Sequence, residues 1–168
     1  MADRAAIAAG QWRNERPDLD TFPMEVLGRL QEVALVISRD RLTPLFASFN
    51  LQPGEFDVLA TLRRSGKPYA LTPTELYEFL MISSGGMTSR IDRLEKNGFI
   101  KRRKHPTDRR GTLVVLTTAG KTLIDDLLDR HVENERAVLS ALNADEQRRL
   151  NNLLAKLLAG LSNSEASA

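Results

Sequence analysis

Apolar residues recur at helical spacing over most of the chain. A long helical pattern covers residues 24–49, and Pro44 is expected to kink it or end it early because proline lacks a backbone N–H. A short helix is expected over residues 2–16. Two long helices are expected near the C-terminus, over about residues 119–141 and 143–160. The pattern therefore predicts a mainly α-helical protein.

Short helices with clear start and stop residues are predicted in the middle of the chain. The first covers residues 53–64, which open with a proline and close before a Ser-Gly pair. The second starts at Thr72, which has capping-box spacing to Glu75. The third covers residues 83–98, with Ser83 as its N-cap, a glycine pair in its first turn and Asn-Gly at its end.

Two short apolar segments, residues 99–101 and 112–116, are typical of β-strands and enclose a basic loop. We expect them to form a β-hairpin. A helix–turn–helix that is followed directly by a hairpin is a winged-helix arrangement. The expected fold is therefore a winged helix–turn–helix, mainly α with a small β-hairpin wing, between long N- and C-terminal helices.

The positive charge of the chain is concentrated in the loop of this hairpin. Residues 101–110, KRRKHPTDRR, contain six Lys or Arg and one Asp, although the whole chain carries a net charge of only +2. Such a local excess favours an anionic partner. Arg103, Arg109 and Arg110 could contact DNA phosphates or a minor groove, with Asp108 holding a neighbouring arginine in one rotamer. The alternative is an edge hairpin that basic residues keep soluble.

The predicted helix over residues 83–98 has one apolar and one polar face. At about 100° per residue, Met87, Ile91 and Leu94 form an inward stripe. The opposite face is short, polar and net positive, and it consists of Thr88, Ser89, Asp92, Arg93 and Lys96. A helix that lies in a major groove requires such a face. A solvated amphipathic helix has the same pattern and is the alternative interpretation.

The last predicted helix carries a wide apolar stripe. Its leucines recur at helical spacing, at Leu150, Leu153, Leu154, Leu157, Leu158 and Leu161. Such a stripe belongs to a helix that is buried against other helices. The unit 51–117 is too small to cover it, so a second copy of the chain is expected, which would place two recognition helices about 34 Å apart on DNA. A helical bundle within one chain is the alternative.

Nothing in the sequence suggests an enzyme. The chain has no cysteine, which excludes disulfides, thiol nucleophiles and cysteine zinc sites. His105 lies among cations and His131 has only scattered carboxylates near it, so we expect no metal site and no cofactor. The N-terminus lacks the apolar run of a signal peptide, and no window approaches about 18 uninterrupted apolar residues. A cytoplasmic protein without membrane contact is therefore expected.

Four motifs resemble the MarR family of winged-helix regulators in their order and spacing. They are LTPTEL, SSGGMTSRIDRLEKNGFIKRR, DRRG and LTTAG, and the resemblance covers about residues 24–161. It implies a homodimeric, ligand-responsive protein that binds promoter DNA. The recognition-helix contacts that it implies are Ser84, Thr88, Ser89 and Arg93. Arg110 would be the wing-tip arginine and Asp108 its partner.

Three further motifs, QWRNERPDLD, GEFDVLATLRR and TSR, are similar to the urate-responsive branch of that family. The resemblance implies a ligand site formed by Trp12, Asp57 and Arg90. An anionic ligand that takes Arg90 would repel Asp57 and displace the recognition helix. Urate, an aromatic carboxylate and a phenolic anion are all open as ligands. Alternatively, Trp12 only pins the N-terminal helix, and Asp57 and Arg90 form a structural ion pair.

We therefore expect three parts. Residues 1–50 are N-terminal helices that contribute to dimerisation and to a ligand cleft, residues 51–117 are the DNA-binding winged helix–turn–helix, and residues 118–168 are C-terminal dimerisation helices with a frayed tail. The expected function is that of a sequence-specific repressor that a small aromatic or anionic ligand releases from DNA. A non-specific architectural DNA-binding protein and a helical interaction module with a basic hairpin are the rival functions.

Overall fold

The computed structural model describes residues 2–80, 86–108 and 111–165, with side chains up to residue 162. The chain forms two compact units, Met1–His131 and Val132–Ala168. This division reflects compactness and does not test the three functional parts expected from the sequence, which stay a prediction. No helix in the described part of the chain is long and apolar enough to cross a membrane.

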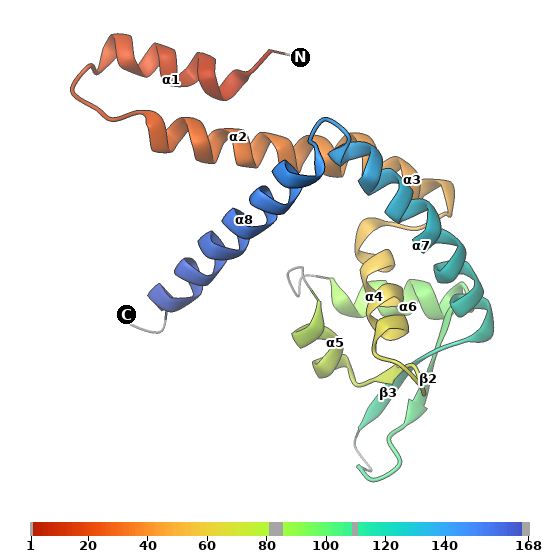
Figure 1. Cartoon of the computed structure of the whole chain (residues 1–168). Coiled ribbons are helices and arrows are strands. Elements are labelled where there is room, and N and C mark those ends of the chain that lie inside the picture. Colours follow the sequence, from red (N-terminus) through yellow and green to blue (C-terminus); the bar gives the residue numbers. More distant parts are fainter. Residues whose placement is uncertain (1, 81–85, 109–110, 166–168) are drawn as a thin grey trace. The chain divides into compact units, whose positions relative to one another are not determined.

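Two N-terminal helices pack side by side in the first unit (Figure 1). They are α1 (Arg4–Glu15) and α2 (Phe22–Ile37). Small residues allow the close approach, since Ala5 and Ala9 are buried and a Cβ at Gly28 would lie 3.3 Å from the Cβ of Ala5. Asp3 caps α1 by accepting the N–H of Ala6 at 3.0 Å.

The interruption predicted at Pro44 is confirmed. A five-residue π-helix, η1 (Ser38–Leu42), separates α2 from α3 (Thr43–Ser48), and Pro44 lies in the first turn of α3. Thr43 donates its N–H to the carbonyl of Ser38, five residues back. Pro44 has no N–H to donate to the preceding turn, so the regular α-helical hydrogen bonding is interrupted there. The wider π-helical turn joins the two helices at this point.

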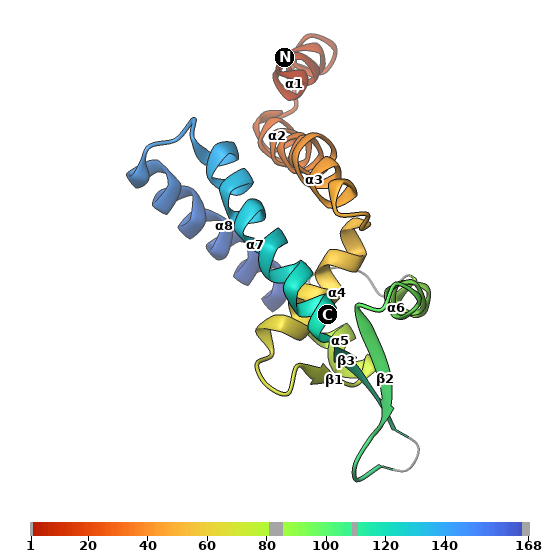
Figure 2. The same ribbon diagram turned by 90° about the vertical axis from the view of Figure 1, so that its right-hand side faces the viewer.

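The winged helix follows and confirms the expected fold. Its helices are α4 (Pro53–Arg64), α5 (Pro73–Phe79) and α6 (Met87–Lys96), and its strands are β1 (Ala70–Leu71), β2 (Ile100–Lys104) and β3 (Thr112–Leu116). The strands form one antiparallel sheet in the order β1-β3-β2. In Figures 1 and 2 the β2–β3 hairpin projects beyond these three helices. The sequence did not predict β1, because two residues are too short to show a period.

The start of α6 differs from the prediction. Its N-cap is Gly86, which has a φ of +81°, and the helix begins at Met87 rather than after Ser83. Gly86 adopts the left-handed region without strain, so it precedes the first turn and does not lie within it. Ser83 and Gly85 lie outside the described residues.

One apolar core holds these elements in place. It includes the fully buried side chains of Leu59, Leu62, Leu76, Leu94, Ile100, Val114, Ile124 and Leu127. They come from α4, α5, α6, the sheet and the first half of α7 (Thr118–Leu139). Since Leu94 is fully buried, α6 is fixed on the core by its inward stripe and presents its other face outward.

The second unit contains the end of α7 and α8 (Ala144–Glu165). The capping box expected at the start of α8 is formed: Glu146 Oε2 accepts the N–H of Asn143 at 2.8 Å, and Asn143 Oδ1 accepts the N–H of Glu146 at 3.0 Å. All six leucines of the stripe are exposed in the single chain, between 38% at Leu150 and 66% at Leu158. Nothing within this unit therefore covers the stripe.

Candidate nucleic-acid interface and ligand site

The structure places the polar face of α6 as predicted. Ile91 and Leu94 are buried, and the exposed residues of the helix include Thr88, Ser89, Asp92, Arg93 and Lys96. Ser89 donates its hydroxyl to the carbonyl of Gly86 at 3.1 Å. The side chains of Thr88 and Lys96 form no hydrogen bond or ion pair with any described residue, which leaves them available to an outside partner. Ser84 lies outside the described residues.

Arg93 has a protein partner that sequence analysis missed. Its Nε lies 3.0 Å from Oε1 of Glu55, a carboxylate at the start of α4. The Arg93 side chain is 49% exposed, whereas that of Glu55 is 1% exposed. Glu55 follows Gln52 by three residues, a spacing that could have indicated a helix cap, but no local pattern predicts that this carboxylate is buried.

Arg102 of β2 joins the wing to the recognition helix, and sequence analysis also missed this role. Its guanidinium contacts the carboxylates of Asp92 and Glu95, and its N–H donates to Glu95 Oε1 at 2.8 Å. The hydrogen bonds to Asp92 and Glu95 raise the pKa of Arg102 above its ordinary value, although partial burial opposes the shift. One of the wing cations is therefore committed to holding β2 against α6.

Three other wing cations have no protein partner among the described residues. Lys101, Arg103 and Lys104 are exposed along β2, and their side chains make no hydrogen bond or ion pair with any described residue. An unpaired cation on an exposed strand can release counterions when it meets phosphate. The described part of the wing therefore keeps the local charge excess that the sequence showed.

The turn of the wing is held by hydrogen bonds that two backbone N–H groups donate. His105 Nδ1 accepts the N–H of Asp108 at 3.1 Å, and the carbonyl of Asp108 accepts the N–H of Gly111 at 3.0 Å. A Cβ at Gly111 would stand 2.8 Å from the Cβ of His105, so only glycine fits there. Arg109 and Arg110 lie outside the described residues, and the role of Asp108 as their partner stays a prediction.

Asp57 and Arg90 lie within electrostatic range of each other at the α4–α6 contact. Burial raises the pKa of Asp57 above its ordinary value of 3.8, and the charges of Arg90, Arg64 and His131 offset part of that rise. No ion pair joins Asp57 to Arg90 in the part of the chain that the structure describes. Arg90 Nη1 is instead buried without a hydrogen-bond acceptor there. The direct structural ion pair considered from the sequence is therefore not formed.

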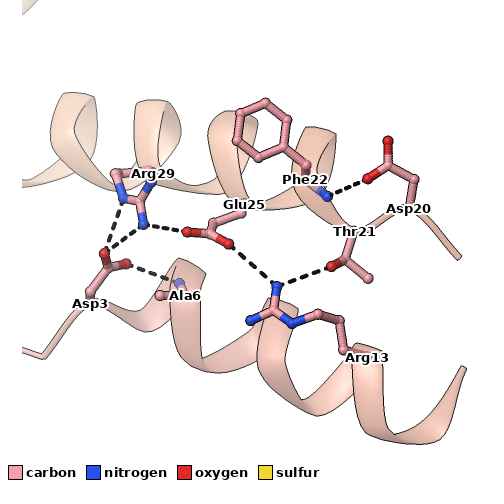
Figure 3. A network of polar contacts seen from close by, with 8 residues as sticks. All are labelled: Asp3, Ala6, Arg13, Asp20, Thr21, Phe22, Glu25 and Arg29. Carbon is pink, nitrogen blue, oxygen red and sulfur yellow. Dashed lines mark hydrogen bonds and ion pairs between the residues drawn. The ribbon is translucent and has the colours of Figure 1, made fainter. Parts of the chain in front are cut away.

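Trp12 is not brought to these two residues by any hydrogen bond or ring contact among the described residues. It lies on α1, which packs against α2, and it is 48% exposed. A polar network fixes the two helices beside it (Figure 3): Arg13 donates to Thr21 Oγ1 at 3.2 Å, and Arg29 contacts both Asp3 and Glu25 at 2.7 Å. The helix that carries Trp12 is therefore firmly attached to α2, whereas about half of the Trp12 side chain is exposed and can contact a partner.

A hollow of about 420 Å³ lies at the turn between α1 and α2. It is lined by Arg13, Pro17, Leu19, Asp20, Thr21, Phe22 and Glu25. Its polar groups already bond to one another, because Arg13 meets Thr21 and Glu25, and Asp20 accepts the N–H of Phe22 at 3.1 Å (Figure 3). Trp12 does not line it, so this hollow is not the ligand site expected from the sequence.

Comparison with known proteins gives consistent matches. The model of the MarR family matches residues 51–112. The transcriptional regulator PecS of Dickeya dadantii is 46% identical over 147 residues, which cover 88% of each chain. A cysteine mutant of MarR from Escherichia coli, in complex with operator DNA, has a TM-score of 0.69 at 28% identity and covers 88% of this chain and 97% of that one. A regulator of this family from Streptomyces coelicolor, in complex with DNA, has a TM-score of 0.74 at 25% identity over 85% and 89% of the two chains.

Proposed function

Because the chain belongs to the MarR family of DNA-binding transcriptional regulators, which are not enzymes, we propose that it is a homodimeric repressor that a small aromatic or anionic ligand releases from DNA. The proposed DNA contacts on α6 and β2 are Thr88, Ser89, Arg93, Lys96 and Arg103. Ser84, Asp108, Arg109 and Arg110 complete the proposed set from the segments on either side. The exposed polar face of α6 and the unpaired cations of β2 support this assignment.

The observation that carries the ligand proposal is the buried Nη1 of Arg90. A buried guanidinium N–H that lacks an acceptor is costly, and an anionic ligand would supply one. Asp57, whose pKa burial raises, stands close enough for its charge to act on Arg90. We therefore assign Arg90 and Asp57 to a site for urate, an aromatic carboxylate or a phenolic anion. Trp12 is included in the proposed site because of the sequence resemblance alone.

The release mechanism follows from where Arg90 is attached. It lies on α6, one turn before Arg93, so a change at Arg90 acts directly on the recognition helix. A ligand anion that binds Arg90 brings negative charge towards the Asp57 carboxylate on α4. The resulting repulsion shifts α6 relative to α4 and moves the DNA-contacting face out of position.

The exposed leucine stripe supports the homodimer. Leu153, Leu158 and Leu161 are each more than half exposed on α8, and α2 adds exposed apolar side chains such as Leu27 and Val33. Each helix by itself thus exposes an apolar face that is unusual on a monomer. A second copy of the chain would cover it with an identical surface, as two-fold dimers do.

The ligand assignment is tested by thermal melting with urate, and with benzoate as a simple aromatic carboxylate. We expect either ligand to raise the Tm of the wild type, and to raise it less in Trp12→Ala and Arg90→Gln. Arg103→Gln removes an equal charge outside the proposed site and should keep the full shift. Equal shifts in the wild type, Trp12→Ala and Arg90→Gln would refute the site.

A further inference from the structure

Glu55 is a fully buried carboxylate at the N-terminal end of α4. Its Oε2 accepts the N–H of Gln52 at 2.7 Å and so caps the helix. Its Oε1 has no aligned hydrogen bond to any described residue, and its one ion-pair partner among them is Arg93. The pair links the start of α4 to the middle of the recognition helix, which lies beside it (Figure 1).

Capping does not explain why this residue carries a charge. A glutamine would accept the N–H of Gln52 equally well, because capping boxes use Glu and Gln alike. Burying a carboxylate costs free energy unless it is paired. The charge of Glu55 is therefore accounted for by Arg93, whose Nε lies 3.0 Å from Oε1.

The ion pair with Glu55 determines how Arg93 can act on DNA. About half of its side chain is exposed on the polar face of α6, while its Nε is held by a carboxylate that also cancels its charge. A guanidinium has five N–H donors, so the remaining donors can still meet a base or a phosphate. Lys96, one turn further along, has no partner among the described residues and keeps its full charge.

We infer that Glu55 is a positioning residue for sequence recognition: it fixes the orientation of Arg93 and removes its non-specific attraction for phosphate. The inference rests on the proposed assignment of Arg93 as a DNA contact. Arg93 then contributes specificity through geometry, whereas Lys96 and the unpaired wing cations contribute affinity through charge. Losing Glu55 should therefore lower affinity for the right sequence and raise affinity for any other.

The test compares Glu55→Gln with the wild type on two duplexes: one that the wild type selects from a random-sequence pool, and a scrambled version of it. The glutamine keeps the cap on Gln52 and nearly the same volume. Glu15→Gln, on α1, makes the same change in net charge and is the matched control. Arg93→Gln and the double variant complete a cycle that reports whether Glu55 acts through Arg93.

We expect Glu55→Gln to bind the selected duplex about tenfold more weakly. On the scrambled duplex it should bind more tightly, with a salt slope steeper by about 0.9, because Arg93 becomes a free cation. Glu15→Gln should change neither slope nor selectivity. In the Arg93→Gln background the Glu55 change should have no further effect on selectivity.

Unchanged selectivity and salt slope in Glu55→Gln would overturn the inference, as would a full effect that persists in the Arg93→Gln background. If Glu55→Gln does not fold, Arg93→Lys decides, since it keeps the charge but not the guanidinium geometry. It should lose affinity only for the selected duplex, and wild-type selectivity in Arg93→Lys would overturn the inference. A wild type that does not distinguish the duplexes overturns the proposed function and this inference with it.

Discussion

Arg90 lies directly over the backbone of Gly54. A Cβ at residue 54 would stand 2.6 Å from Arg90 Cζ and 3.0 Å from its Cδ, which is closer than van der Waals contact allows. Glycine at this position therefore lets the recognition helix bring the Arg90 guanidinium against the first turn of α4. The same close approach buries Arg90 Nη1 without an acceptor among the described residues.

Gly54→Ala should consequently displace Arg90 while leaving the helix start intact. We expect the urate-induced rise in Tm to fall by at least half, because the displaced guanidinium no longer meets the ligand. Gly10→Ala is the matched control, since its added Cβ would lie 3.7 Å from Arg13, an ordinary contact. A full ligand response in Gly54→Ala would contradict the role of this contact.

The burial of Asp57 predicts how the stability of the protein depends on pH. Burial raises its pKa in the folded state, so ionised Asp57 is disfavoured there, and the protein loses stability as pH rises through that raised pKa. Asp57→Asn should therefore melt at a higher temperature than the wild type at about pH 7. The difference should shrink as pH falls towards the ordinary value of 3.8.

Asp125 should change stability with pH in the direction opposite to Asp57, and the same melting experiment can measure both. Hydrogen bonds from Lys121 and Arg63 lower its pKa, so its contribution is present at neutral pH and is lost as pH falls through the lowered pKa. Asp125→Asn should be less stable than the wild type at about pH 7, by less than about 1 kcal/mol, because the Arg63 and Asp125 side chains are still 33% and 36% exposed. Shifts of the same sign for both variants would contradict the burial of Asp57.

The wing cations should control the salt dependence of DNA binding. Each phosphate contact that is removed should reduce the slope of log affinity against log salt by about 0.9. Arg103→Gln and Lys104→Gln should each show this reduction on selected and scrambled DNA alike. Lys67→Gln, an exposed lysine outside the wing, should keep the wild-type slope. Wild-type slopes in both wing variants would mean that these residues do not contact phosphate.

The leucine stripe gives a prediction about assembly. Leu158 is 66% exposed in the single chain, so replacing it should cost a monomer less than about 0.5 kcal/mol. In a dimer interface, Leu158→Asp buries a charge and should shift the protein towards monomer in sedimentation equilibrium. Asn151→Asp adds the same charge at another exposed position of α8 and should leave the dimer intact. An unaffected dimer in Leu158→Asp would place the interface elsewhere.

Features set by neighbouring residues in the chain could be predicted from the sequence, and features set by tertiary contacts could not. The capping boxes at Thr72 and Asn143 formed as expected because each depends on side chains only three residues apart. The start of α6 was predicted too early because two consecutive glycines can also lie within the first turn of a helix. Only the φ of +81° shows that Gly86 precedes the helix. The partners of Glu55 and Arg102 depend on how separate elements pack, which no local pattern contains.

The most direct measurement is a fluorescence titration of the wild type on the selected duplex and on its scrambled version, with and without urate. The account predicts saturable binding that favours the selected duplex and that urate weakens. If the protein prefers the selected duplex but urate does not weaken binding, the proposed regulator function stands and other aromatic anions should be tested as ligands. Equal binding to both duplexes would contradict sequence recognition by α6 and would favour a non-specific architectural protein that binds through its basic wing.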